Sequence, residues 1–356
     1  MKNTALPIKI NPDPSFIRFQ QTLLLDGKAD RVPLFDWYID RRIKEYVIDR
    51  PLISVDDEVD FWINAGYDFV QAKLDRKESH TAVKQIIPIQ TVSTSRGLIR
   101  NMEQLNASDF RWTPIYNNTW KPDDYNCDYL RKLAHKLPAE MKLIVPVADI
   151  FTGCWMAMGF EDFCYALYDD EGSELISELF RRRAIAEIKS LEVFAECVGS
   201  RLGAVIYADD LGYSEGLLVS ADVYRKFLWP YVREVIQMAK RMGVPVIYHS
   251  DGKLWDVLND FAEMGVNGIQ PLEPKSMNLT ELKQNWGHRF CLMGSIDLDR
   301  LSRGTPAEID EMVRLRIDQL GYNGGFMPGV SNTVPGYVNV INYKAMIEAV
   351  FKYGKH

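Results

Sequence analysis

A short apolar run that ends at a histidine and an acid is the strongest constraint on the fold of this chain. Residues 244–249 (VPVIYH) are mostly apolar and β-branched, and Ser250, Asp251 and Gly252 follow directly. Such a run is typical of a strand buried on both faces in a parallel sheet. Parallel α/β folds build their active sites at the carboxyl ends of the strands. The run therefore predicts a buried strand that brings His249 and Asp251 to a functional site.

The same pattern recurs along the chain. Helical patterns, with apolar residues at three- and four-residue steps, lie between most of the runs and are clearest over 174–198 and 221–242. Eight strands alternating with helices predict an α/β fold of the (β/α)8 TIM-barrel type. An open doubly wound sheet is the alternative, but no glycine-rich dinucleotide turn follows the first run. The eight predicted strands lie near Val32, Phe69, Ile144, Val205, Val246, Ile269, Leu292 and Phe326.

Composition narrows the class of protein. A length of 356 residues with 47% hydrophobic residues suits one barrel domain over 1–356. The net charge of −7 argues against nucleic acid as a partner. The five cysteines are odd in number and form no CxxC motif, so we expect reduced thiols and a cytoplasmic protein. We expect no membrane association, because the most apolar window, 143–160, is broken by Pro146, Asp149 and two glycines.

Residues 75–140 interrupt the alternation of strands and helices. The runs 83–92 and 97–102 are separated by Ser93-Thr-Ser-Arg, and they predict a small β-hairpin or meander inserted after the second strand. The stretch 112–129 is polar and aromatic with little periodicity. An insertion at the rim of the active site could be a lid or a docking surface for a partner; a simple cover of the barrel edge is the alternative.

A series of motifs in the second half of the chain resembles one known family. HSDG at 249–252, PLEP at 271–274, MGSID at 293–297, GTPAE at 304–308 and GGFMPGVSN at 324–332 follow one another as in the uroporphyrinogen decarboxylase superfamily. Upstream, Asp209-Asp210-Leu-Gly and Gly66-Tyr-Asp-Phe extend the resemblance, which is weakest between residues 74 and 142. It implies a TIM barrel with its site at the carboxyl ends of the strands.

The superfamily contains two kinds of enzyme, and residues 36–42 distinguish them. True uroporphyrinogen decarboxylases carry an arginine-rich segment here that binds substrate carboxylates, whereas this chain has Asp36-Trp-Tyr-Ile-Asp40-Arg41-Arg42. An acid at this place would repel a polycarboxylate. We expect Arg41 and Arg42 to open a helix or to form its solvated face. The resemblance therefore favours the second kind, the corrinoid-dependent methyltransferases.

The residues at the zinc-binding positions favour one branch of these methyltransferases. Members that methylate a thiol hold zinc with a His-x-Cys motif and a later cysteine. Here His249 is present, but Asp251 and Val330 stand where the cysteines would be. The thiolate set is therefore absent, and a harder, oxygen-rich site remains. We expect His249, Asp251 and Glu273 to bind a divalent metal, Zn²⁺ first, or to polarise a substrate oxygen directly.

The absence of the cysteine ligands fits those corrinoid-dependent methyltransferases that demethylate methoxylated compounds. They pass the methyl group of a small molecule to the Co(I) corrinoid of a partner protein. For this chain we expect that molecule to be aromatic. Because Co(I) is already a strong nucleophile, the enzyme must stabilise the departing oxygen. We expect His249, Glu273 and Asp209 to be catalytic. The expected substrate-binding residues are Asp36, Tyr38, Asp149, Tyr207, Asp210 and Asn332, and the expected apolar floor is Trp37, Tyr38, Phe151, Trp155, Tyr207 and Tyr213.

Several alternatives stay open. The chain could be a decarboxylase for a tetrapyrrole or a small acid, with Asp209 or Asp210 handling protons, or a non-catalytic corrinoid- or tetrapyrrole-binding protein. Asp251 could cap a helix beginning near Lys253, and Asp297 could cap another. The expected partner is a corrinoid protein docked over the barrel mouth, with residues 83–129 near its edge. The direction of methyl transfer and the formation of a homodimer are left open.

Overall fold

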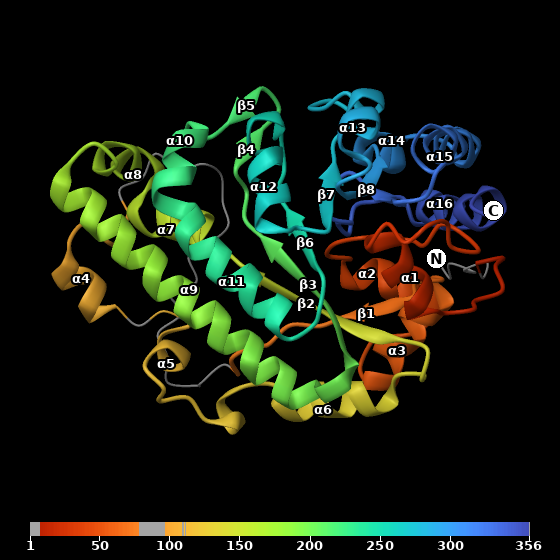
Figure 1. Cartoon of the computed structure of the whole chain (residues 1–356). Helices are drawn as coiled ribbons and strands as arrows, with labels where there is room; N and C mark the ends of the chain where they lie inside the picture. Colours follow the sequence, from red (N-terminus) through yellow and green to blue (C-terminus); the bar gives the residue numbers. More distant parts are fainter. Residues whose placement is uncertain (1–7, 78–96, 109, 111, 356) are drawn as a thin grey trace.

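Seven parallel strands form the central sheet of the molecule (Figure 1). The computed structural model describes residues 8–77, 97–108, 110 and 112–355. In these residues the sheet has the order β1-β2-β3-β6-β7-β8-β9, and every neighbouring pair is parallel. Seven of the eight predicted strands are thereby confirmed. Their bounds are β1 Phe69–Gln71, β2 Lys142–Ala148, β3 Leu202–Ala208, β6 Val246–His249, β7 Gly268–Leu272, β8 Cys291–Ile296 and β9 Phe326–Val330.

Helices follow the strands and cover the sheet, and Figure 1 shows the long helix α9 beside α11. The helices predicted over 174–198 and 221–242 are confirmed by α9 and by the succession α10, η3 and α11. The α-helices before the carboxyl half are α1 Phe16–Leu23, α2 Arg41–Ile48, α3 Val55–Asn64, α4 Met102–Ala107, α5 Thr113–Tyr116, α6 Cys127–Lys136, α7 Phe151–Met158, α8 Phe160–Ala166 and α9 Asp170–Val198. The others are α10 Ala221–Val223, α11 Trp229–Arg241, α12 Leu258–Met264, α13 Leu279–Trp286, α14 Leu298–Arg303, α15 Pro306–Leu320 and α16 Val340–Tyr353, with short 3-10 or π turns at η1 Pro122–Asp124, η2 Gly199–Arg201, η3 Tyr224–Leu228 and η4 Trp255–Val257.

The segment around Val32 is not a strand, which corrects the eighth predicted strand. It lies between β9 and β1 all the same: Phe35 N–H donates to Pro328 O of β9 at 3.0 Å, and the Phe35 ring lies 5.5 Å from that of Phe69 in β1. A regular ladder does not form because Val330 N–H donates to the side chain of Asp36 at 2.6 Å and not to a backbone carbonyl. The sheet is therefore curled like a TIM barrel, but in the described residues no eighth strand closes it with a regular ladder.

The segments pack closely at Gly329 in β9. A Cβ atom at this position would lie 1.7 Å from the carbonyl oxygen of Phe35. Only glycine lets the two backbones approach to this distance. The near-closure of the sheet thus depends on this one small residue.

The predicted β-rich insertion is not confirmed. The run 83–92 lies outside the described residues. The run 97–102 forms no strand; Gly97 and Ile99 instead donate backbone hydrogen bonds to Met158 and Ala157 at the end of α7. From Met102 to Lys136 the described residues form α4, α5, η1 and α6.

A small feature that we did not predict follows β3. Gly212–Tyr213 (β4) and Gly216–Leu217 (β5) form a two-stranded antiparallel hairpin at the carboxyl end of the sheet.

No helix in the described part of the chain is long and apolar enough to span a membrane.

Candidate active site

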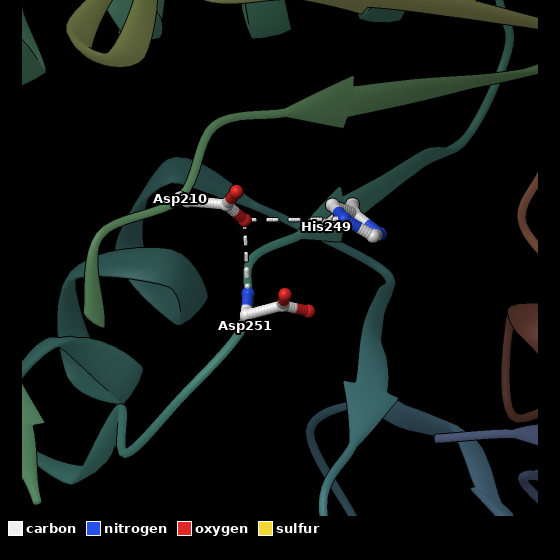
Figure 2. Close-up of side chains that lie close together, drawn as sticks. All are labelled: Asp210, His249 and Asp251. Atoms are coloured by element: carbon white, nitrogen blue, oxygen red, sulfur yellow. Dashed lines mark hydrogen bonds and ion pairs between the residues drawn. The ribbon is translucent and has the colours of Figure 1, made fainter. Parts of the chain in front are cut away.

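Three side chains gather where two adjacent strands end. Asp210 follows β3, His249 is the last residue of β6, and Asp251 comes two residues later. Because β3 and β6 are parallel neighbours, with Ala208 paired to His249, their carboxyl ends lie together. One ligand atom from each of the three residues lies within 4.8 Å of the others (Figure 2). We call these residues the Asp-His-Asp cluster.

Asp210 links the other two members of the Asp-His-Asp cluster. Its Oδ1 lies 4.0 Å from Nε2 of His249 and accepts a hydrogen bond of 3.1 Å from the backbone N–H of Asp251, as the dashed lines in Figure 2 show. The side chain of Asp210 is 46% exposed, so this carboxylate faces the solvent-filled mouth. It can therefore contact a bound ion or substrate.

His249 is held in place on two sides. Its Nδ1 forms a hydrogen bond with Oε1 of Gln270 in β7, and the ring stacks on Trp37 with centroids 4.7 Å apart and planes 30° from parallel. The residue is 7% exposed. A partner at Nδ1 fixes the orientation of the ring and favours a proton there, which leaves the lone pair of Nε2 free to bind a metal ion.

Only one of the two carboxylate oxygens of Asp251 accepts a hydrogen bond from a described residue. Oδ2 accepts a hydrogen bond of 2.9 Å from Nδ2 of Asn332, which follows β9. Oδ1 is buried and has no hydrogen-bond partner among the described residues. Burial, with the nearby charge of Asp210, raises the pKa of Asp251 to about 6. Asp251 caps no helix, because the next one, η4, begins at Trp255.

This arrangement fits a divalent cation. A buried carboxylate oxygen without a partner is costly unless something binds it. One imidazole nitrogen and two carboxylates form an acceptable ligand set for zinc. The hydrogen bond that Gln270 accepts from His249 and the one that Asn332 donates to Asp251 are of the kind that orient metal ligands. Asp210 thus lies close enough to His249 and Asp251 to share an ion with them, whereas Glu273, expected from the sequence as the third ligand, is not part of this group.

Glu273 is close to the Asp-His-Asp cluster but outside it. Its Oε2 accepts hydrogen bonds from Gly252 N–H at 2.8 Å and from the Ser276 hydroxyl at 3.1 Å. Gly252 has a φ of +94°, and a Cβ there would lie 2.4 Å from the backbone nitrogen of Tyr213. Glu273 therefore supports the turn that follows Asp251.

Asp209 supports a helix. Its two oxygens accept hydrogen bonds from the backbone N–H groups of Phe151 and Thr152, at 2.7 and 2.8 Å, where α7 begins. The hydroxyl of Tyr207 donates a third at 2.9 Å. Burial raises the pKa of Asp209 to about 7, although the two amides oppose the shift. Both residues are buried, and these internal hydrogen bonds engage the Asp209 carboxylate, expected to be catalytic, and the Tyr207 hydroxyl, expected to bind substrate.

Asp36 lies in the core and not at the mouth. Its carboxylate accepts hydrogen bonds from Val330 N–H and from the hydroxyls of Tyr67 and Tyr343, and none of its surface is exposed. Burial raises its pKa to about 6. Asp36 therefore joins the first segment to β9, and the expectation that it binds substrate is not supported.

Two of the other expected residues are accessible. Tyr38 is 56% exposed. Asp149 follows β2, has a φ of +70° and is exposed, yet desolvation by the surrounding protein raises its pKa while the Arg183 guanidinium opposes the shift. An exposed carboxyl with a raised pKa lies in a recess. The backbone N–H of Asp149 donates to the carbonyl of Ala208 at 3.0 Å, which places Asp149 at the end of β3, close to Asp210.

Two features of the site, Gln270 beside His249 and the place of Asp210 in the Asp-His-Asp cluster, were not predicted from the sequence. A glutamine in the apolar run of β7 was a visible signal, because a buried polar residue needs a partner. Asp209 and Asp210 were both noted, but their roles cannot be told apart from adjacency alone.

Arg41 and Arg42 are exposed at the start of α2, as expected, and Asp297 caps α14 by accepting from Arg300 N–H at 2.9 Å.

The cysteines form no part of the site. All five are free in the structure. Cys154 is buried near the mouth, and burial raises the pKa of its thiol well above the usual value. Cys154 is therefore a small apolar neighbour of the rim and not a reactive thiol.

A comparison with models of protein families identifies the family of this chain. The model of the uroporphyrinogen decarboxylase family, URO-D, matches residues 103–353, more than half of the chain. The chain belongs to the uroporphyrinogen decarboxylase family. This family match covers α7, the strands from β2 to β9 and all three residues of the Asp-His-Asp cluster.

Among solved structures, a methyltransferase from Methanosarcina mazei aligns with this URO-D chain with a TM-score of 0.65 and 14% identity, covering 96% of this chain and 99% of the other. At this identity the likeness concerns the fold alone. The IOLI protein, solved with a bound zinc atom, aligns with a TM-score of 0.44 and 14% identity over 90% of this chain and 100% of the other, which is too distant to support any inference. A search of curated protein sequences found no match.

Proposed function

We propose that this protein is a corrinoid-dependent methyltransferase that moves a methyl group from a methoxylated small molecule to the Co(I) corrinoid of a partner protein. The observation that carries the proposal is the Asp-His-Asp cluster at the carboxyl ends of β3 and β6, with an unengaged carboxylate oxygen on Asp251. Membership of the family and the fold shared with a methyltransferase support it.

The chemistry requires stabilisation of the departing oxygen. When Co(I) attacks the methyl carbon, the carbon–oxygen bond breaks and the oxygen keeps the electron pair. A divalent metal held by Asp210, His249 and Asp251 would supply Lewis-acid stabilisation of that negative charge. Without a metal, a protonated His249 could donate from Nε2 to the same oxygen, with Asp210 at 4.0 Å stabilising the imidazolium.

The decarboxylase alternative has less support. Asp149, Asp210 and Asp251 make the mouth acidic, which disfavours a polycarboxylate substrate. The two arginines that follow the first segment do not offset this charge. Arg41 pairs with Glu45 at 2.7 Å, and Arg42 donates to the carbonyl of Gly336 at 2.9 Å.

The change His249→Ala tests the proposal. We expect it to lower methyl transfer on the order of a hundredfold or more, because it removes the ligand or proton donor at the departing oxygen. The measurement is the spectral conversion of a Co(I) corrinoid protein to its methylated form in the presence of methoxylated donors. His135→Ala, in an exposed position on α6, is the matched control and should leave the rate unchanged.

Two results would count against the proposal. Near-normal turnover of His249→Ala would end it. Full activity after exhaustive chelation would leave only its metal-free form. The partner is tested separately, because pull-downs with the cognate corrinoid protein should show binding at about micromolar concentrations, as transient complexes do.

A further inference from the structure

A pocket lies directly beside the Asp-His-Asp cluster, between the tips of β7, β8 and β9. Its volume is about 400 Å3. Glu273 and Asn332 stand in its wall, and both also touch the turn that carries Asp251: Asn332 donates to the Asp251 carboxylate, and Glu273 accepts from Gly252 N–H. A molecule in this pocket would therefore have one end next to the Asp-His-Asp cluster.

The wall of this pocket combines polar groups with apolar surface. Hydroxyl groups of Ser214, Ser302, Ser331 and Tyr337 line it, and its apolar contributions are Pro274, Leu298 and the ring of Tyr337. In the described part of the chain, neither the Ser214 hydroxyl nor that of Tyr337 has a hydrogen-bond partner. Tyr337 as a residue is 68% exposed. The pocket thus offers free hydroxyl groups beside one aromatic face.

The charges in the pocket are largely balanced. Lys275 pairs with Asp297 at 3.4 Å, and Arg303 pairs with Asp299 at 3.1 Å. The carboxylate of Glu273 has no cationic partner among the described residues, and Asp251 and Asp210 lie beyond it. The pocket is therefore slightly acidic where it meets the Asp-His-Asp cluster. A carboxylate on the ligand would be repelled there, whereas hydroxyl groups could donate to Glu273.

We propose that this pocket receives the body of the methyl donor, and that the donor is a neutral methyl ether rich in hydroxyl groups, of the sugar or polyol class. The proposal rests on the proposed function. An aromatic donor would remove water from Ser214, Glu273 and Tyr337 without replacing its hydrogen bonds. A sugar-like ring replaces those bonds and lays its C–H face on Tyr337.

This substrate class departs from the aromatic donor expected from the sequence. That expectation required an apolar floor of aromatic side chains at the strand ends. Phe151 and Tyr207 are buried in the core, and Trp37 stacks on His249. None of the six residues of the expected floor, which also include Tyr38, Trp155 and Tyr213, lines the pocket beside the Asp-His-Asp cluster.

Binding to the protein alone tests the proposal without the corrinoid partner. Titration calorimetry would compare an O-methyl glucose with a methoxybenzoate. We expect the sugar ether to bind at least tenfold more tightly, and Tyr337→Ala and Ser214→Ala to weaken it roughly fivefold to tenfold, since each removes about one hydrogen bond or contact. Tyr322→Ala is the matched control: Tyr322 is also exposed, at 55%, but it precedes β9 and lies at the other end of the strands.

The outcomes separate this inference from the proposed function. Binding of the sugar ether that depends on Tyr337, without methyl transfer to Co(I), would support the pocket and overturn the proposed function. Methyl transfer from the methoxybenzoate that Tyr337→Ala leaves unchanged would support the proposed function and overturn this substrate class. No binding of the sugar ether, or binding unaffected by both pocket variants, would also overturn it.

Discussion

The imidazole of His249 has contacts on three sides, and each contact has a separate role. Gln270 fixes the ring through Nδ1, Trp37 covers one face, and Asp210 lies at Nε2. Asp251 completes the Asp-His-Asp cluster with an oxygen that no described residue engages. At the scale of single residues, the function therefore depends on which carboxylates are free to bind and which are already used.

Metal binding by single-residue variants tests this distinction. We expect Asp210→Asn and Asp251→Asn to weaken Co²⁺ or Zn²⁺ binding on the order of a hundredfold, because each removes a charged ligand. Glu273→Gln should weaken it by about tenfold or less, because Glu273 acts through Gly252. Calorimetry and the Co²⁺ absorption spectrum measure both effects. The opposite ranking, with Glu273→Gln the most damaging, would restore the ligand set expected from the sequence.

At the scale of elements, the start of α7 depends on Asp209. The helix has no side-chain cap of its own, and Asp209 from the end of β3 accepts its first two free backbone N–H groups. This contact joins the carboxyl end of one strand to the helix that follows its neighbour β2. It places Asp209 beside the active site without giving it a free oxygen.

Replacement of Asp209 should therefore affect stability more than chemistry. We expect Asp209→Ala to lower the free energy of unfolding by about 3 kcal/mol, since it leaves two buried amides and the Tyr207 hydroxyl unpaired. Asp209→Asn keeps an acceptor and should retain most of the metal affinity and methyl transfer. Thermal unfolding and metal titration measure the two effects. An Asp209→Asn variant that is stable and binds metal but is inactive would show that the carboxyl group is catalytic.

At the scale of the whole molecule, the first segment brings the two edges of the curled sheet together. Asp36 makes this junction, because it binds Val330 in β9, Tyr67 next to β1, and Tyr343 in α16. No cation neutralises its charge in the described surroundings, and burial raises its pKa from the usual 3.8 to about 6. The folded protein therefore holds this proton more tightly than the unfolded chain does.

This difference makes a pH-dependent contribution to stability. Because the pKa of Asp36 is raised in the folded protein, its stabilising contribution is fully present below about pH 4 and is lost as the pH rises to about 6. This loss lowers the free energy of unfolding by on the order of 3 kcal/mol. Asp36→Asn mimics the protonated acid, so its stability relative to the wild type should rise over the same range. Thermal unfolding of both proteins at several pH values measures this change. A difference that does not vary with pH would contradict the raised pKa.

Much of the fold and part of the site could be predicted from the sequence. Seven strands and the long helices were visible because a strand buried on both faces needs a continuous apolar run and an amphipathic helix needs apolar residues at regular steps. The run that ends at His249 was sufficient to place His249 and Asp251 at the carboxyl edge of a parallel sheet. Apolar runs and the polar residues at their ends are local properties of the chain. The parallel arrangement of the strands brings those polar residues to the same edge of the sheet.

The tertiary structure decided how each polar residue is used. Asp209 and Asp210 are adjacent in sequence, yet one binds the start of α7 and the other faces His249. Asp36 and Asp251 both come at or near the end of an apolar run. The oxygens of Asp36, however, accept hydrogen bonds inside the core. Whether a carboxylate is free depends on which amides and hydroxyls reach it from segments distant in the chain, such as Val330 for Asp36 and Asn332 for Asp251. No local pattern contains that information, because those donors become neighbours only when the sheet has curled.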